Sequence, residues 1–279
     1  GLLTLRYYGL ILAAAGVIAA LLTGRMYRYF YPGDSSVQGY TWAWDALLWV
    51  LVPGLLGARI YHVLFPSLSS LAVGVDRAFF IKHPYEILNF WQGGLGTPGA
   101  ITGAGIGLFV YSRREGIPFS RLLDSALPGA ALGVIVLSAA NHIIQAGYGP
   151  PADLPWCTVI RPENRLPGFE MRACYHPLHF YLAAWDFLAA VLTFLVNMRW
   201  KSRLKPGDLS VFYLLLFSLG RFTAGFFRMD YSPLMGANLD QLFMLGLFIG
   251  SVLILLIRRG QLPGANRTVN ASRLDTIQE

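Results

Sequence analysis

The chain has 279 residues, of which 55% are hydrophobic and only 13% are charged, and its mean hydropathy is +0.50. A soluble globular domain carries about 25% charged residues, so this composition indicates a membrane protein that crosses the bilayer several times. The formal net charge of +7 does not point to a nucleic-acid-binding protein, because excess Lys and Arg in such a chain mostly mark cytoplasmic loops.

The predicted elements are membrane-spanning helices. A helix needs about 20 apolar residues to cross the hydrocarbon core, and seven segments approach that requirement. The third is the least apolar because it is rich in Gly and Thr, and such small residues suit close packing between helices. The sequence therefore predicts an all-α polytopic membrane protein with about seven transmembrane helices. In chain order the predicted spans are 8–23, 41–65, 96–111, 122–145, 177–198, 209–227 and 241–257.

Basic residues follow the first, third, fifth and seventh predicted spans. With seven spans, all four basic loops fall on one side of the membrane, which the positive-inside rule assigns to the cytoplasm. The N-terminus is then outside and the C-terminus cytoplasmic. Residues 1–260 form a single transmembrane domain, and 261–279 form a polar cytoplasmic tail. The basic residues that set this orientation are Arg25, Arg28, Arg113, Arg114, Arg199, Lys201, Arg203, Lys205, Arg258 and Arg259.

Two longer loops are expected outside the cytoplasm. The first, near 66–94, is rich in aromatic residues and is expected to lie in the membrane interface. The second, near 148–176, holds the only cysteines of the chain, Cys157 and Cys174. An oxidising exterior would let them form a disulfide, and two free thiols are the alternative.

The end of the fourth span, within 132–149, carries a polar cluster of Ser138, Asn141, His142 and Gln145. Polar side chains at membrane depth need partners, so such a cluster is expected to face a cavity or a ligand. Asp186 lies inside the fifth span, and we expect it to pair with an arginine or a polar neighbour.

Several short motifs occur in a defined order along the spans. They are RYYG at 6–9, GARIYHV at 57–63, PYEILNFWQGGL at 84–95, LLDSALPG at 122–129, HPLHFY at 176–181 and GRFTAGFFR at 220–228. In this order and setting, the chain resembles the prolipoprotein diacylglyceryl transferase family. Asn141 stands in the register of the family signature G-R-x-x-N-F-x-N-x-E, and Gln241 stands where the family has the glutamine of QLLS.

The resemblance implies a reaction that moves a diacylglyceryl group from phosphatidylglycerol to the thiol of a lipoprotein precursor, in the bacterial cytoplasmic membrane. Such a site needs cationic donors for the phosphate, which arginine supplies well. Arginine inside a membrane span is expensive and usually functional. No cofactor or nucleic-acid partner is expected, and the sequence has no histidine and cysteine cluster with metal-ligand spacing. The expected lipid- or phosphate-binding residues are Arg59, Gly93, Gly94, Asn141, Arg221, Arg228 and Gln241.

The chain departs from the family pattern at four positions. Ser138 replaces the signature arginine and Ala146 its glutamate, Pro98 replaces the histidine of GGxxxHGG, and Gly225 replaces the glutamate of RFxxEFxR. Two interpretations stay open. The protein is a transferase with an altered site, for which the weak catalytic candidates are His142 and His176. Alternatively, it is a catalytically inactive homologue that serves as a structural or lipid-binding subunit of a larger membrane complex. A transporter or channel has only the number of spans in its favour.

Overall fold

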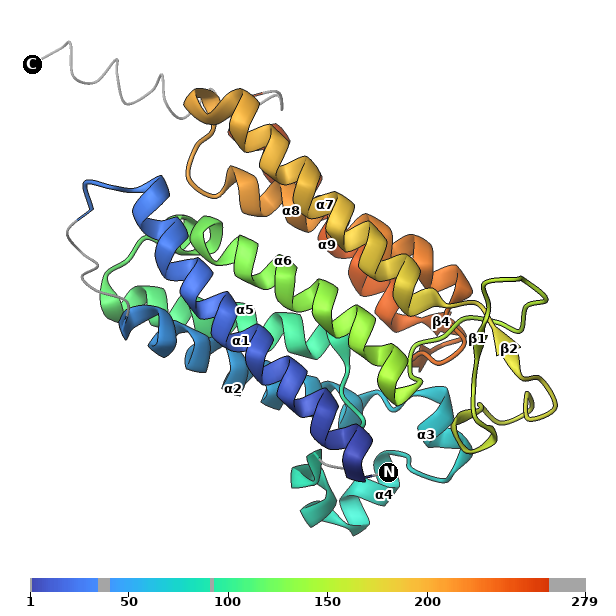
Figure 1. Ribbon diagram of the computed structural model, residues 1–279. Helices are drawn as coiled ribbons and strands as arrows, with labels where there is room; N and C mark the ends of the chain where they lie inside the picture. The colour runs from blue at the N-terminus through green and yellow to red at the C-terminus, as the bar shows by residue number, and fades with distance from the viewer. Residues whose placement is uncertain (1, 35–40, 91–92, 261–279) are drawn as a thin grey trace, which may run out of the picture.

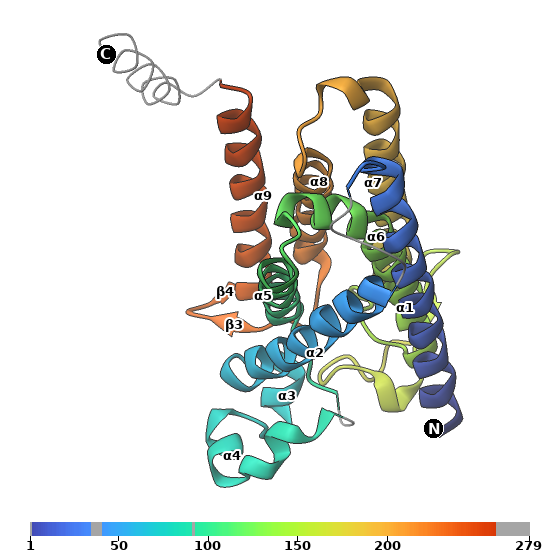
Figure 2. The same ribbon diagram turned by 90° about the vertical axis from the view of Figure 1, so that its left-hand side faces the viewer.

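The computed structural model of the protein describes residues 2–34, 41–90 and 93–260, so the predicted tail at 261–279 lies outside the described residues. The long helices run side by side, with smaller elements gathered at one end of the bundle (Figures 1 and 2). The helices are α1 (Leu2–Phe30), α2 (Thr41–Leu64), α3 (Leu68–Ala72), α4 (Arg77–Lys82), α5 (Thr97–Glu115), α6 (Phe119–Ile144), α7 (Leu178–Trp200), α8 (Asp208–Ala224) and α9 (Leu239–Arg258). The antiparallel strand pairs are β1 (Thr158–Val159) with β2 (Cys174–Tyr175), and β3 (Pro233–Leu234) with β4 (Ala237–Asn238).

The expectation of an all-α polytopic membrane protein is confirmed. Six helices in the described part of the chain are long and apolar enough to span a membrane: α1, α2, α6, α7, α8 and α9. The third predicted span is a helix as well, α5, with 19 residues. It is not among those six, so six of the seven predicted spans are long and apolar enough to cross a membrane within the described residues, and the exception is the span that the sequence marked as least apolar.

Close backbone contact with α2 explains why α5 is poor in large apolar residues. A Cβ placed on Gly99 would collide with the carbonyl of Gly57, and one on Gly103 would collide with the carbonyl of Pro53. Glycine therefore allows the two helix backbones to touch along this seam. Small residues of this kind stabilise helix pairs in membranes because they maximise packing at the interface.

All the basic loops lie at one end of the bundle. In Figure 1 the last turns of α1, α5, α7 and α9 lie toward the upper left, while α3, α4 and both strand pairs lie toward the lower right. Acidic side chains connect the elements of the basic end: Asp208 forms an ion pair with Arg258 at 2.8 Å and accepts a hydrogen bond from Arg259 at 3.3 Å. Asp124 of α6 accepts from the backbone N–H of Gly207 at 2.6 Å, at the start of α8. This arrangement agrees with the orientation expected from the basic loops.

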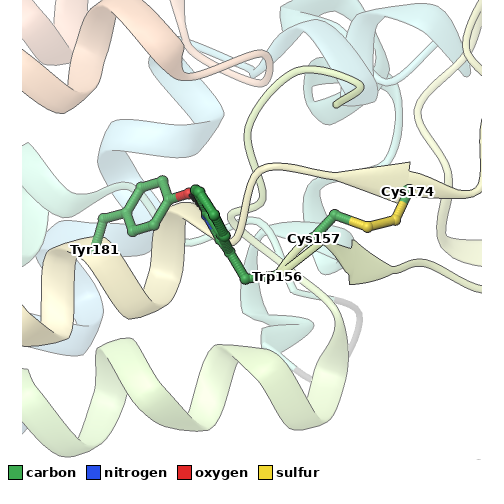
Figure 3. Close-up of a disulfide and its surroundings, with 4 residues drawn as sticks. All are labelled: Trp156, Cys157, Cys174 and Tyr181. Carbon is green, nitrogen blue, oxygen red and sulfur yellow. Dashed lines mark hydrogen bonds between the residues drawn. A yellow bond between two sulfur atoms is a disulfide. The ribbon is translucent and has the colours of Figure 1, made fainter. Parts of the chain in front are cut away.

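The opposite end carries the second long loop, and Cys157 and Cys174 form a disulfide there, with their Cα atoms 5.5 Å apart. Figure 3 shows the disulfide at the β1–β2 pair, with the neighbouring Trp156 side chain reaching Tyr181 of α7. The Trp156 indole N–H donates to the Tyr181 hydroxyl at 3.0 Å. The loop is therefore attached to the first turn of α7 as well as closed on itself.

Candidate functional site

Arg59 of α2 holds the first outer loop in place. It is only 5% exposed, and its guanidinium donates to four backbone carbonyls. Nε donates to Ile87 at 3.0 Å and Nη2 to Glu86 at 2.5 Å. Nη1 donates to Gly93 at 2.7 Å and to Gly94 at 3.2 Å. In this conformation the donors of Arg59 bind the protein itself, so an anion would have to compete with these carbonyls.

Gly93 and Gly94 make this arrangement possible. Both have positive φ, +84° and +71°, a region that glycine adopts without steric cost. A Cβ on Gly94 would lie 2.6 Å from the His62 ring and 2.8 Å from Nη1 of Arg59. The glycines expected to bind lipid therefore bring the loop carbonyls close to Arg59.

Arg221 of α8 joins three helices through one polar network. Its Nη2 donates to Oδ2 of Asp186 on α7 at 2.7 Å and to Oγ of Ser138 on α6 at 3.0 Å. The Ser138 hydroxyl donates to the same Asp186 oxygen at 3.2 Å. The Asp186 side chain is 0% exposed and that of Arg221 is 20% exposed. The expectation that Asp186 pairs with an arginine is confirmed.

The network keeps unused hydrogen-bonding capacity. Nε of Arg221 and Oδ1 of Asp186 are buried and have no hydrogen-bond partner among the described residues. Buried polar atoms are nearly always satisfied. A polar group of a ligand that reached this point would therefore find both a donor and an acceptor.

A narrow cleft of about 30 Å³ lies beside Arg221. This volume holds little more than a water molecule. Three of the predicted lipid-binding residues, Arg221, Arg228 and Gln241, line it together with Asp240 and Gly225.

Contacts between the end of α8 and the start of α9 shape the cleft. The Gln241 amide donates to the Phe222 carbonyl at 3.0 Å, and a Cβ on Gly225 would lie 2.8 Å from Cγ of Gln241. The loss of a side chain at position 225 thus leaves room for Gln241. Asp240 accepts from the Tyr61 hydroxyl at 2.8 Å.

Arg228 is exposed at the outer end of the cleft. The helix α8 ends at Ala224 and tightens into a 3-10 turn over Gly225–Phe227, so Arg228 lies in extended backbone and not on the helix that carries Arg221. Its Nε donates to the Asp230 carbonyl at 2.8 Å. Among the described residues no hydrogen bond occupies its two Nη groups, which leaves them available to an anion.

The polar cluster at the end of α6 reaches several different partners. Ser138 joins the Arg221 network, and His142 Nδ1 lies 3.1 Å from His179 Nε2 on α7. Gln145 has φ of +54° and binds the second outer loop, where Oε1 accepts from Asn164 at 2.8 Å.

The remaining predicted residues lie at the outer ends of α6 and α7. The Asn141 amide makes no hydrogen bond within the described residues, and it lies near Gly147, whose Cβ would be 3.8 Å from Nδ2. His176 comes just before α7, with its Nδ1 3.5 Å from the Tyr181 hydroxyl. The Cβ that Gly149 lacks would lie 3.0 Å from the Cβ of His176.

Three of the four departures from the family pattern lie at or next to this site. Ser138 bonds Arg221, Gly225 lines the cleft, and Pro98 follows Thr97, which also lines it. Ala146 lies in the turn after α6, where its N–H donates to the Asn141 carbonyl at 2.9 Å. Sequence reasoning missed Asp240, although its place beside Gln241 in the first turn of α9 was a usable signal.

A model of the prolipoprotein diacylglyceryl transferase family matches residues 1–257. The chain belongs to this family. Three relatives named phosphatidylglycerol–prolipoprotein diacylglyceryl transferase illustrate the similarity. The protein of Fervidobacterium nodosum is 32% identical over 82% of this chain and 73% of its own length. That of Cutibacterium acnes is 31% identical over 92% and 82%, and that of a Nostoc species 29% over 94% and 89%. With its apolar helices, this family member is a multi-pass bacterial membrane protein.

Proposed function

We propose that the protein binds phosphatidylglycerol at the Arg221 cleft and transfers its diacylglyceryl group to the cysteine of a lipoprotein precursor in the bacterial cytoplasmic membrane. The observation that carries the proposal is the pair of arginines on one cleft. Among the residues that the structure describes, Nε of Arg221 inside the cleft has no hydrogen-bond partner, and both Nη groups of Arg228 at its outer end are available. Arginine at membrane depth is expensive and usually functional.

The reaction has a simple balance. The thiol sulfur forms a bond to the glyceryl carbon that carries the phosphate, the thiol proton leaves to a base, and the C–O bond to the phosphate breaks. The electrons of that bond stay on the departing glycerol phosphate, which gains one negative charge. Preorganised cationic donors stabilise charge that develops in this way.

Each of the predicted lipid-binding residues has a proposed task, whether it lines the cleft or lies near it. Arg228 receives the headgroup phosphate from the outer surface, and Arg221 stabilises the charge that develops as the phosphate departs. Gln241 and Asn141 orient the polar headgroup. Arg59, with Gly93 and Gly94, acts at a distance by fixing the outer loop. Because the cleft measures only about 30 Å³, lipid entry requires it to widen.

One observation favours the second candidate, an inactive homologue that binds lipid or supports a larger membrane assembly. The charge of Arg221 is already balanced by Asp186 at 2.7 Å, which weakens its attraction for a phosphate. Under this alternative the protein retains lipid at Arg228 without transfer.

The test is reconstitution of the purified protein in vesicles of phosphatidylglycerol that carries a labelled acyl chain, with a lipobox peptide. The proposal predicts label on the peptide, none on a peptide with serine in place of cysteine, and a loss of at least about 100-fold in rate for Arg221→Ala. Arg114→Ala is the matched control, because Arg114 is exposed and its contacts, an ion pair with Glu115 and a position over the Trp49 ring, lie away from the cleft. Lipid retention without labelled peptide supports the second candidate.

A further inference from the structure

Two histidines face each other between α6 and α7. His142 Nδ1 lies 3.1 Å from His179 Nε2, and the ring centroids are 5.2 Å apart. Both rings also contact Phe180, with centroids at 5.0 and 4.5 Å. His179 is 1% exposed, whereas His142 is exposed. The pair thus has one buried member and one that a second molecule can reach.

The pair lies about one helical turn from the Arg221 network along α6 and about two turns from it along α7. Ser138 and His142 are four residues apart on α6, which places them on one face with Cβ atoms about 5–6 Å apart. Asp186 and His179 are seven residues apart on α7, again on one face. The helix α6 runs toward the end of the bundle that carries the outer loops (Figure 1). His142 follows Ser138 along α6, so the histidine pair lies on the outer side of the Arg221 network. A thiol that arrives from outside would meet His142 before it meets the arginine.

The hydrogen bond fixes the direction in which a proton can move. If His142 Nδ1 donates to His179 Nε2, the lone pair of His142 Nε2 is free to accept a proton. His179 Nδ1 is buried and has no hydrogen-bond partner among the described residues, so His179 cannot pass a proton further inward. A proton taken up by His142 must leave again on the exposed side.

From this geometry we infer that His142 is the base that accepts the proton of the attacking thiol, and that His179 is the positioning residue that orients it. The inference rests on the proposed transferase function and adds which residue removes the proton from the attacking thiol. The S–H bond breaks, its proton binds His142 Nε2, and the sulfur forms the C–S bond as the C–O bond to the phosphate breaks. His142 then releases the proton to the outer solution.

Among the described residues, few charged groups surround the pair. Asp186 on α7 and Arg221 on α8 form one neutral network at 2.7 Å, and His176 precedes α7 by two residues. On α1, which packs along α6, the side chains of residues 2–8 lie outside the described residues. A change of pH therefore acts on a histidine pair whose nearest described charges, those of Asp186 and Arg221, cancel each other.

The experiment measures transfer to the lipobox peptide from pH 6 to 9 in the reconstituted protein. A thiol of ordinary pKa, about 8.5, is about 3% ionised at pH 7. Loss of the base in His142→Gln is therefore expected to lower the rate by about 30-fold at pH 7, with near-complete recovery at pH 9. His83→Gln, in the first outer loop, is the matched control and is expected to keep the unsubstituted profile.

His179 has its own test. In His179→Gln the side-chain oxygen can still accept from His142 Nδ1, so transfer is expected to persist. His179→Leu removes the acceptor and is expected to show the same pH-dependent loss as His142→Gln. If the unsubstituted protein transfers and His142→Gln matches it at every pH, this inference is overturned while the proposed function stands. If the unsubstituted protein shows no transfer, the proposed function fails and the inference fails with it.

Discussion

Arg221 and Asp186 form a buried ion pair at 2.7 Å between α8 and α7, with the Asp186 side chain fully buried. Ser138 bridges the two residues from α6, so one network connects three membrane helices. It also lies beside the cleft that carries the proposed lipid site. The pair therefore has two consequences, one for stability and one for chemistry.

For stability, removing one partner leaves a buried charge without compensation. Asp186→Asn is expected to destabilise the protein by about 3–5 kcal/mol, whereas the double variant Asp186→Asn with Arg221→Gln should lose less than either single change alone. Denaturant unfolding in detergent measures both. Additive losses in the double variant would show that the two charges do not interact.

Arg59 is expected to control the order of the first outer loop. Arg59→Lys keeps the charge but cannot serve four carbonyls in the planar geometry of a guanidinium. Hydrogen–deuterium exchange at 84–90 should therefore accelerate in Arg59→Lys and in Gly94→Ala, while the β1–β2 loop stays unchanged. Unaltered exchange at 84–90 in both variants would mean that Arg59 does not hold this loop.

The glycine seam between α2 and α5 permits a matched comparison on one helix. Gly103→Ala places a Cβ against the Pro53 carbonyl, whereas a Cβ on Gly105 meets nothing within 4 Å. Overpacking of this kind costs about 1–3 kcal/mol, while Gly105→Ala should be neutral or stabilising because alanine favours a helix. Thermal unfolding of the two variants in detergent distinguishes them. Equal melting temperatures would show that the seam is not tightly packed.

The disulfide is expected to form in the purified protein and to stabilise the second outer loop. Cys157 and Cys174 are 17 residues apart, and closing a loop of that length contributes about 3 kcal/mol. Iodoacetamide should modify neither cysteine before reduction and both after it, as read by mass spectrometry. Modification without reductant would contradict the pairing.

Much of the architecture could be predicted from the sequence because hydrophobic segments and basic loops constrain a membrane protein strongly. The helical spans and the gathering of the basic loops at one end of the bundle followed from that constraint, and the cost of a charge at membrane depth led to the Asp186 pairing. Family motifs also led to Arg221, Arg228 and Gln241, which line one cleft.

The rest depended on how the helices are placed against one another. The contact between His142 and His179 requires the register of α6 against α7, which no local pattern reveals. The donors of Arg59 bind loop carbonyls. Because every residue has a main-chain carbonyl, the amino-acid sequence gives no signal for these contacts.

The most direct test of the central claim is mass spectrometry of a lipobox peptide incubated with the reconstituted protein in phosphatidylglycerol vesicles, beside the Fervidobacterium nodosum relative as a positive control. We predict a diacylglyceryl thioether on the cysteine, formed by the unsubstituted protein and by Arg114→Ala but not by Arg221→Ala. An unmodified peptide, in vesicles where the relative modifies it, would contradict the transferase function.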